Sequence, residues 1–521
     1  MKKTLIQKLR TIFILLLFVS GYSKNYDIKA LGADNTAKIK CTDLINKTII
    51  QAANEGGGTL YFSSGTYLTG AITLKSNITI YLEAGATLKF SSDFKDYLPF
   101  QNVRYEGVFM NTFAPLLNAY KAENISIKGE GTLDGNGFAW WDEEKRISDE
   151  IKAKNGIEKS NDLQKMWAAA NKDLKVQPYY QGIFKRQFFR PPFIQFLECN
   201  KIRIEGIRIQ NSPFWTINPE GCNDIVVHGV TIFNPANDPH GPNTDGINPS
   251  SCSNVRISDC FISVGDDCIT IKSGRDFNGR NYGKACENIT ITNCVMLAGH
   301  GGVVIGSEMS GGVKNITISN CVFDGTDAGI RMKASRGRGG IVENIRVSNI
   351  VMRNISRNAF TFDLFYDRSS KPEPVSERTP IFRNIHISDV SGVGINKAGE
   401  IKGIEEMPIS ELSFTNINLE TKEGFSSDIA ANLTFNNVDI STQKGSALEF
   451  KNCEGLVLND IRSKKPLQNQ PIIKVTDSKN VLLNNCFQRV PADVFLEFKN
   501  SEVIQGNNFF SLVKEPIRKV Q

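Results

Sequence analysis

Three aspartates and one histidine lie in short glycine-bearing segments in the middle of the chain. Asp245 lies in NTDG, Asp266 and Asp267 lie in GDD, and His300 lies in GHG. Hydrolysis of a glycosidic bond needs an acid to protonate the leaving oxygen, and a base or nucleophile for the other side of the sugar. Clustered carboxylates also raise one another's pKa, which helps one of them keep its proton. The cluster therefore predicts acid–base cleavage of a sugar chain.

Each segment has a plainer interpretation when it is taken alone. Aspartates are common in turns, so GDD by itself indicates a turn at a strand end. A single histidine is more often structural than catalytic, although the glycines beside His300 permit close approach to a ligand and a hydrogen bond that tunes a carboxylate. His240, in DPHGPNTDG, is expected to shape the loop before Asp245. The three segments together favour a catalytic site.

A basic pair follows the aspartates after one more repeat of the chain. Arg331 and Lys333 stand two residues apart in RMK, so on a strand both side chains point to one face. They have no acidic neighbour in the sequence. Arginine binds a carboxylate through its planar fork and lysine binds it as a point charge. A solvated basic face is the alternative, but beside the aspartates the pair favours an acidic sugar as substrate.

The segments that must position these residues form a repeat. Each unit begins with Asn or a similar residue, alternates apolar and polar positions over four to five residues, and ends in Asn, Asp or Gly before an apolar residue. The spacing of about 20–35 residues is typical of solenoids, and the alternation is strand periodicity. The units start at Asn77, Asn124, Lys201, Asp224, Asn254, Asn288, Asn315, Asn344, Asn384, Glu411, Asn432 and Asn480.

The repeat predicts an all-β chain folded as a parallel β-helix. Short strands would stack on their counterparts one coil away, alternate residues would fill a continuous core, and the Asn side chains would stack along the axis. No long helical pattern separates the units, which argues against βαβ packing. A β-sandwich is the structural alternative, but it has no need of the same Asn at the same place in successive units.

Two segments depart from the repeat. Thr42–Asn54 has a Thr start, helical apolar spacing and a GGG stop, and is predicted to be a short helix that caps the N-terminal end of the β-helix. Residues 143–190 are charged at first and then aromatic, and are predicted to form a helical insertion on a loop. The insertion is either a solvated decoration or a wall at one end of a cleft.

Residues 1–23 have the features of a secretory signal peptide, namely a basic start, an apolar run and small residues near a cleavage point. The formal charge of +6 falls to +2 when the four basic residues of this segment are removed, which takes away the main support for a nucleic-acid partner. The run is too short to span a bilayer, so we expect a secreted or periplasmic protein without a stable membrane anchor. No Cys/His cluster predicts a metal.

The chain has eleven cysteines, an odd number. Several recur at one place in the repeat, including Cys260, Cys294 and Cys321, and the favoured interpretation is a stack of buried thiols. A disulfide between Cys260 and Cys268, or between Cys222 and Cys252, remains open because sequence alone cannot pair cysteines.

The motifs NTDG, GDD, GHG and RMK, in this order and spacing, together with the opening DIKALGADNTAK and the segment GEGTLDGNG, resemble the polygalacturonases of glycoside hydrolase family 28. The resemblance covers nearly the whole of residues 24–521, which we expect to form one domain. It implies a right-handed parallel β-helix and inverting hydrolysis of α-1,4-galacturonosyl linkages without a metal or other cofactor.

The resemblance also implies roles for single residues. Asp266 resembles the general acid, while Asp245 and Asp267 resemble the pair that positions and deprotonates the attacking water. His300 is similar to the histidine that supports the acid. The substrate-binding residues implied are Arg331 and Lys333, which would hold a galacturonate carboxylate, Asn243, which would orient Asp245 or the sugar, and Tyr366, whose surroundings FDLFYD are less specific.

The predicted substrate is an acidic plant polysaccharide or oligogalacturonide, cleaved by a monomeric enzyme. If the enzyme inverts, we expect the acid and base carboxyl groups ~6.5–9.5 Å apart. The long insertion favours exo-action, with Tyr179, Tyr180, Lys185, Arg186, Phe188 and Arg190 available to grip a terminal galacturonate. The alternatives are a rhamnogalacturonan or xylogalacturonan hydrolase of the same family, a pectate lyase, and a non-catalytic β-helix that binds polysaccharide.

Overall fold

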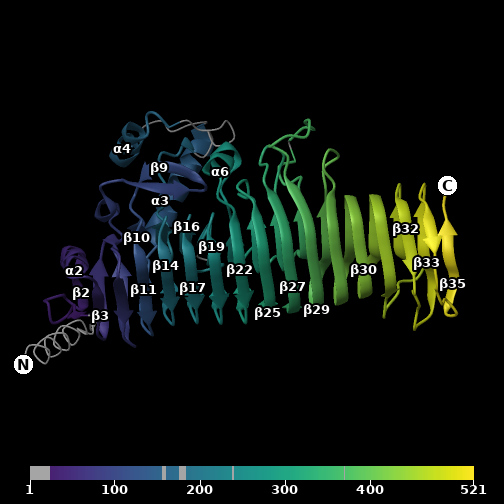
Figure 1. The fold of residues 1–521 in the computed structure, drawn as a ribbon, viewed down its shortest axis with the longest axis horizontal. Helices are drawn as coiled ribbons and strands as arrows, with labels where there is room; N and C mark the ends of the chain where they lie inside the picture. The colour runs from purple at the N-terminus through teal and green to yellow at the C-terminus, as the bar shows by residue number, and fades with distance from the viewer. Residues whose placement is uncertain (1–23, 155–159, 175–183, 238–239, 369) are drawn as a thin grey trace, which may run out of the picture.

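The chain winds into an elongated solenoid of short parallel strands (Figure 1). The structure is a computed structural model that describes residues 24–154, 160–174, 184–237, 240–368 and 370–521. The predicted signal peptide, residues 1–23, lies outside this described part. Each strand pairs with its counterpart one coil further along the chain, for example Ile225 of one coil with Val255 of the next. The fold is therefore the predicted right-handed parallel β-helix.

Three ladders of strands run along the solenoid. The first contains β1 (Lys24–Asp27), β3 (Gly58–Phe62), β6 (Ile78–Leu82), β11 (Glu123–Gly129), β14 (Asn200–Glu205), β17 (Asn223–His228), β19 (Ser253–Ser258) and β22 (Cys286–Thr292). The second contains β2 (Thr36–Lys40), β4 (Gly65–Thr69), β7 (Ala86–Phe90), β12 (Thr132–Asp134), β15 (Arg208–Gln210), β18 (Thr231–Phe233), β20 (Phe261–Ser263) and β23 (Val295–Ala298).

The third ladder carries the segments of chemical interest. It contains β5 (Ile72–Thr73), β10 (Leu117–Tyr120), β13 (Ile194–Leu197), β16 (Ile217–Glu220), β21 (Ile269–Ile271), β24 (Val303–Gly306), β26 (Ile330–Lys333) and β28 (Asn358–Asp363). Further along, long strands bend from one ladder into the next and end in short ones: β25 (Val313–Asp324), β27 (Ile341–Arg353), β29 (Ile381–Lys402), β30 (Ile409–Arg462), β31 (Pro471–Thr476), β32 (Lys479–Asn484), β33 (Ala492–Lys499), β34 (Val503–Gln505) and β35 (Val513–Lys519).

The first residue of each predicted unit has a backbone in the left-handed region. All twelve have φ between 52° and 63°, a conformation that Asn tolerates better than most residues. Their side chains form a ladder, because Asn288 donates to Asn254 over 3.3 Å and accepts from Asn315 over 3.0 Å. The predicted asparagine stack is confirmed at these coils.

The core is one continuous column of inward-facing aliphatic, aromatic and cysteine side chains. All eleven cysteines are buried and none forms a disulfide. Cys260, Cys294 and Cys321 lie at equivalent positions of three successive coils, as the thiol-stack interpretation predicts. The alternative pairings Cys260–Cys268 and Cys222–Cys252 are wrong.

Helix α2 (Thr42–Asn54) covers the N-terminal end of the solenoid, as predicted (Figure 1). It buries Ile45, Ile49 and Ala52 against the first coils. Its Thr start does not act as an N-cap, since the hydroxyl of Thr42 accepts a hydrogen bond from the backbone N–H of Gly70 instead. This contact ties the cap to the following coil.

The insertion forms helices on the flank of the solenoid, beside a hairpin that the repeat pattern did not predict. Helix α3 (Phe138–Lys154) begins five residues before the expected boundary, and α4 (Asp162–Ala170) follows it. The hairpin is β8 (Gln101–Tyr105) with β9 (Val108–Thr112). Its Tyr105 stacks on Phe214, and Trp167 of α4 packs on Phe189. A short 3₁₀ helix (Phe94–Tyr97) and α6 (Asp276–Tyr282) complete the elements.

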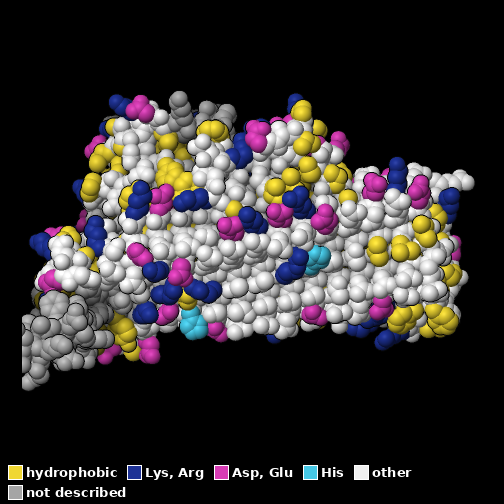
Figure 2. Space-filling model, in the orientation of Figure 1, with side chains coloured by type: hydrophobic (Ala, Val, Ile, Leu, Met, Phe, Trp, Pro, Cys, Tyr) yellow, Lys and Arg dark blue, Asp and Glu magenta, His cyan; other side chains and the backbone are white. Residues whose placement is uncertain are grey.

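No helix in the described ranges is long and apolar enough to cross a membrane. On the face drawn in Figure 2, acidic and basic side chains are interspersed along the body. This mixed pattern agrees with the near-neutral charge expected without the basic N-terminal segment.

Candidate active site

The four motifs lie on successive coils of the third ladder. NTDG, GDD and GHG come just before the extended segments of their coils, and RMK lies within β26. Single bridges join Ile217 to Ile247 and Ile247 to Ile269, so the NTDG segment lies directly beside the GDD segment. GHG precedes β24, whose Val304 pairs with Thr270 on one side and Arg331 on the other. The offset of twenty-one residues between Asp245 and Asp266 is thus one coil of the β-helix.

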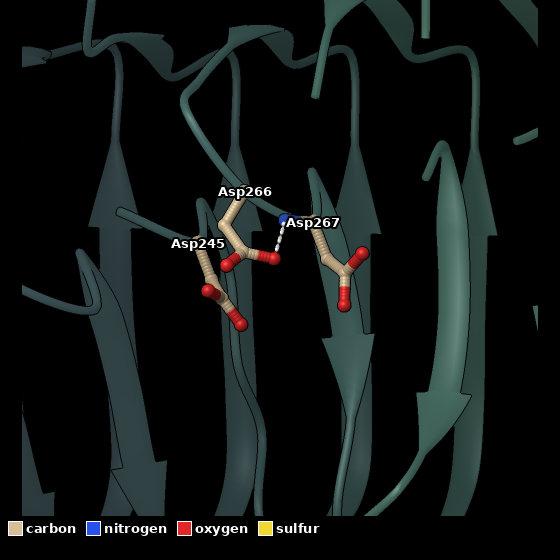
Figure 3. Close-up of side chains that lie close together, drawn as sticks. All are labelled: Asp245, Asp266 and Asp267. Atoms are coloured by element: carbon tan, nitrogen blue, oxygen red, sulfur yellow. Dashed lines mark hydrogen bonds between the residues drawn. The ribbon is translucent and has the colours of Figure 1, made fainter. Parts of the chain in front are cut away.

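The chain bends at GDD, which is the condition for adjacent aspartates to reach the same face. Residues 264–268 lie between β20 and β21 and are not part of a strand. A Cβ on Gly265 would lie 2.2 Å from the carbonyl oxygen of Gly241, so only glycine fits there. Figure 3 shows the carboxylates of Asp245, Asp266 and Asp267 directed the same way. The expected turn is confirmed.

The three carboxylates form one tight cluster. One oxygen from each lies within 4.8 Å of one oxygen from each of the others. Asp245 accepts hydrogen bonds from Asn248 at 2.9 Å and Thr270 at 3.3 Å, and Asp267 accepts one from the Nζ of Lys333 at 3.1 Å. Two oxygens 4.8 Å apart can share one bound water with ordinary hydrogen-bond lengths.

This spacing corrects the expectation for the acid–base distance. The predicted separation of ~6.5–9.5 Å is wrong for the nearest oxygens, which lie within 4.8 Å. The physical reason is the fold: neighbouring parallel strands are only about 4.8 Å apart, and Asp245 stands one strand from the GDD turn. The distance alone therefore gives no support for inversion.

Asp266 is the most accessible of the three carboxylates. Its side chain is 17% exposed, against 4% for Asp245 and 2% for Asp267. One oxygen of Asp266 faces the Nδ1 of His300 at 3.1 Å and accepts from the backbone N–H of Asp267 at 2.9 Å. The other accepts from the amide of Asn243 at 3.3 Å. Asn243 therefore contacts Asp266, whereas the sequence analysis expected it to orient Asp245 or the sugar.

Asp266 was expected to be the carboxyl group that keeps its proton, but the higher pKa belongs to Asp245. Burial, together with the charge of Asp266, raises the pKa of Asp245 to about 7. Burial also acts to raise the pKa of Asp266, but the hydrogen bond and charge of His300 outweigh it and lower that pKa to about 2. The same hydrogen bond raises the pKa of His300. In the free protein Asp245 thus keeps its proton to a higher pH than Asp266 does, and the bond to Asp266 favours the charged form of His300.

The basic pair lines a cavity beside this cluster. The cavity has a volume of about 230 Å³, and its walls include His300, Arg331, Lys333 and Tyr366. The ring of Tyr366 lies 5.6 Å from the guanidinium of Arg331 and 5.7 Å from the ammonium of Lys333. Lys333 binds Asp267, whereas Arg331 has no hydrogen bond or ion pair with any residue in the described ranges. All four predicted residues are brought together.

Lys272 and its ion-pair partner Glu308 are at the site and escaped sequence reasoning. Lys272 lies 3.5 Å from Asp245, 3.3 Å from Glu308 and 4.1 Å from the ring centre of Trp215. Burial lowers the pKa of Lys272, but the charges of Glu308 and Asp245 outweigh this effect and leave it raised. The signal that could have found Lys272 is its place in the sequence, since IKSG puts it at the end of the strand that follows GDD.

The insertion does not present the expected gripping side chains. Phe188 and the side chain of Arg190 are almost completely buried, and Arg186 forms an ion pair with Glu144. Lys185 is exposed, and Tyr179 and Tyr180 lie outside the described residues. Arg190 instead points inward and donates to the side chain of Asn243 over 2.8 Å. The prediction that Arg190 and Phe188 grip a terminal sugar is wrong because both lie within the packing of the insertion.

The aspartate cluster is also the one group of acidic, histidine or cysteine side chains in the described ranges close enough together to hold a metal ion. Its cationic neighbours Lys272, Lys333 and His300 already supply positive charge to these oxygens. The arrangement suits proton transfer among carboxylates, with a cationic cavity for an anionic group at its side.

Comparison with known proteins agrees with this geometry. The family model described as glycosyl hydrolases family 28 matches residues 181–430, which include all four motifs. The match supports membership of this family. The enzyme is therefore a glycoside hydrolase. A probable polygalacturonase from Vitis vinifera is 28% identical over 400 residues, which cover 75% of this chain and 73% of the relative.

Two solved structures have the same architecture. A hyperthermoactive exopolygalacturonase from Thermotoga maritima matches with a TM-score of 0.66 and 29% identity, over 79% of this chain and 91% of its own. A family 28 exopolygalacturonase from Yersinia enterocolitica matches with a TM-score of 0.64 and 21% identity, over 95% of this chain and 80% of its own. The second likeness concerns the fold alone.

Proposed function

We propose that the enzyme hydrolyses α-1,4-galacturonosyl linkages in polygalacturonate and related pectic chains. The observation that carries the proposal is the cationic cavity of Arg331, Lys333 and Tyr366 directly beside three clustered carboxylates. A uronate sugar supplies the carboxylate that such a cavity binds. The likeness to a polygalacturonase from grapevine supports the same substrate class.

In this proposal Asp266 protonates the leaving oxygen, because it is the most accessible carboxylate of the cluster. Asp245 and Asp267 together hold and deprotonate the attacking water. His300 binds Asp266 and keeps it oriented. Substrate covers Asp266 and brings a negative charge to the neighbouring cavity, and both effects raise the pKa of Asp266 so that it can carry the proton in the complex.

Inversion at the anomeric carbon is part of the proposal. A nucleophilic carboxylate must reach the sugar carbon itself, but the side chains of Asp245 and Asp267 are only 4% and 2% exposed. A water molecule held between them is small enough to reach the sugar carbon, which their own side chains cannot reach. Proton NMR of the first product should therefore detect the β-anomer from the α-linked substrate, and an initial α-anomer would contradict the roles given to Asp245 and Asp267.

The general-acid role of Asp266 is tested by Asp266→Asn. Removing the acid should lower kcat by roughly 10²–10⁴-fold, while the folded state and the binding of oligogalacturonide remain. Sugar release is measured by reducing ends, and binding by calorimetry. Equal sugar release by wild type and variant would favour a non-catalytic polysaccharide-binding β-helix. An unsaturated product that disappears with a chelator would favour a pectate lyase.

The choice of galacturonate over rhamnogalacturonan depends on the basic pair. A rhamnose on the leaving side is neutral and gives no reason for Arg331 and Lys333 to line that cavity. Lys333→Ala should raise KM on polygalacturonate strongly; because Lys333 also binds Asp267, a fall in kcat is expected with it. Faster turnover of rhamnogalacturonan than of polygalacturonate by the wild type would overturn this choice.

The proposal places the enzyme outside the cytoplasm, as a monomer acting on polymers or fragments of plant cell walls. The support for this location is the signal-like composition of residues 1–23. Cell fractionation with the intact N-terminus tests it.

A further inference from the structure

The insertion is connected to the proposed general acid by a chain of polar contacts that runs from buried Arg190 to the exposed side chain of Asn243. Glu144 of α3 forms an ion pair with the Nε of Arg190 at 2.8 Å. An Nη of Arg190 donates to the Oδ1 of Asn243 at 2.8 Å. The Nδ2 of Asn243 then donates to Asp266 at 3.3 Å. Glu144, Arg190 and Asn243 thus link helix α3 of the insertion to the reacting carboxyl group.

Arg190 fixes more than the position of the amide. A guanidinium has donors and no acceptor, so the oxygen of the Asn243 side chain must face Arg190 and the NH₂ must face Asp266. Without Arg190 the amide is free to turn and present its oxygen to Asp266. The other Nη of Arg190 donates to the carbonyls of Pro213 and Pro242, at 2.8 and 2.5 Å, which holds the segment before Asn243 in place.

The positive charge of Arg190 is balanced by Glu144, which also belongs to the insertion. Its side chain is 1% exposed and lies 5.1 Å from the ring centre of Phe214. A buried guanidinium costs free energy unless it is paired and hydrogen-bonded, and Glu144 and the two carbonyls provide these partners. A wall that only blocked the cleft would have no need for a buried cation aimed at the acid's neighbour.

We infer that Arg190 is a positioning residue that acts through Asn243 to present a hydrogen-bond donor to Asp266. The inference rests on the proposed role of Asp266. A donor on this oxygen stabilises the carboxylate that forms when Asp266 gives up its proton, and it keeps the carboxyl plane aimed at the leaving oxygen. The insertion therefore contributes to proton transfer as well as to the shape of the cleft.

The primary test is Arg190→Gln, with Arg146→Gln as the matched control. Arg146 lies on α3 near Glu144, but it is exposed and pairs with Glu143 and Glu150. By analogy with the outer partners of metal ligands, whose loss costs about 10–100-fold, Arg190→Gln should lower kcat by that factor with KM nearly unchanged. Arg146→Gln should leave kcat unchanged, and Arg190→Lys should restore part of the loss.

A double-variant cycle separates positioning from a general loss of structure. If Arg190 acts through Asn243, then Arg190→Gln should have little further effect on kcat in the background of Asn243→Ala. Equal effects in both backgrounds would overturn the inference, as would a rise in KM without a fall in kcat. Thermal unfolding of each variant identifies any that fails to fold. Asn243→Ala tests the same contact to Asp266 while the buried Arg190 stays in place.

A titration without substrate keeps this inference distinguishable from the proposed function. With histidines isotopically labelled, the imidazole of His300 is followed by NMR and assigned with His300→Gln. The charged groups around Asp266 are His300, Asp245, Asp267, Lys272 and Lys333. Arg190→Gln should release the Asp266 carboxylate from its fixed orientation, weaken the hydrogen bond that raises the pKa of His300, and move the His300 midpoint to lower pH. An unchanged midpoint would contradict the inference even if the wild type proves inactive on polygalacturonate.

Discussion

Asp266 receives three hydrogen bonds, two at one carboxylate oxygen and one at the other. The donors are the ring of His300, the backbone N–H of Asp267 and the amide of Asn243. Burial acts to raise the pKa of Asp266, but the hydrogen bond and charge of His300 outweigh it and lower that pKa to about 2, while burial raises the pKa of Asp245 to about 7. Catalysis by Asp266 as acid then requires the proton to move between the two carboxyl groups when substrate binds.

This arrangement predicts how activity depends on pH. Between the two pKa values the pair carries one proton, which the reaction needs. The proton is lost as pH rises through the higher pKa of about 7. We therefore expect kcat/KM to be high below pH 7 and to fall about tenfold for each pH unit above it. The control is Lys272→Met: it removes a cation that lowers the pKa of Asp245, so its decline should begin at higher pH. Activity that keeps rising into the alkaline range would contradict the assignment.

The motif residues were predictable from the sequence, and their supporting residues were not. NTDG, GDD, GHG and RMK each carry a residue type whose chemistry is evident, and one coil of a β-helix brings them together. Arg190 belongs to a loop segment with several similar cations, and its inward direction depends on packing against Phe214 and on the partner Glu144. Such long-range contacts leave no periodic signal in the sequence.

At the scale of the elements, the asparagine that begins each strand has a backbone role and a side-chain role. At Asn288, φ is 57° and the side chain bonds to Asn254 and Asn315 in the neighbouring coils. The repeat pattern therefore located the left-handed residue that begins each predicted unit. It gave no information on α3, which starts at Phe138 and buries its own Trp140, or on the hairpin β8–β9.

The two roles can be separated by substitution. Asn288→Ala loses the ladder hydrogen bonds and also pays about 1–2 kcal/mol for a side chain in the left-handed region. Asn288→Gly loses the same hydrogen bonds but relieves the backbone. We therefore expect the alanine variant to unfold at lower denaturant concentration than the glycine variant, with the wild type highest. Equal midpoints for the two variants would mean that the ladder alone determines the stability at this turn.

The GDD turn gives a second prediction at this scale. In Gly265→Ala the new methyl group would meet the carbonyl oxygens of Gly241 and Pro235 at 2.2 and 3.0 Å. Because both contacts are with backbone, the turn itself must move, at a cost of about 1–3 kcal/mol. Activity should fall more than stability, since Asp266 follows directly. A variant with normal kcat would show that the exact turn is not needed to aim this carboxyl group.

At the scale of the whole molecule, the β-helix is protected at both of its described ends. Helix α2 covers the first coil, and the last strand, β35, contains Pro516 with Lys514, Arg518 and Lys519. Proline lacks a backbone donor, and charged side chains oppose pairing with another strand edge. Both devices oppose edge-to-edge pairing of two molecules, and the capping helix was evident from the sequence because its apolar spacing differs from that of the strands.

The two sides of the catalytic cluster differ, and this difference underlies our last prediction. On the side of β26 and β28 a cavity is lined by Arg331, Lys333 and Tyr366. On the other side Trp215 and Arg190 are buried among the insertion and the hairpin β8–β9. A polymer needs room on both sides of the cleaved bond for endo-action, whereas a closed side stops the chain. Loops set this property, so the repeat could not predict it.

If Asp266 protonates a leaving sugar held by Arg331 and Lys333, the closed side takes the non-reducing end of the substrate. The enzyme should then release monogalacturonate from the first minutes, with little fall in the viscosity of polygalacturonate. With an oligogalacturonide labelled at its reducing end, the label should remain on a chain that shortens by one sugar at a time. An early ladder of unlabelled oligomers would show endo-action, and early release of labelled monomer would reverse the orientation of the chain in the cleft.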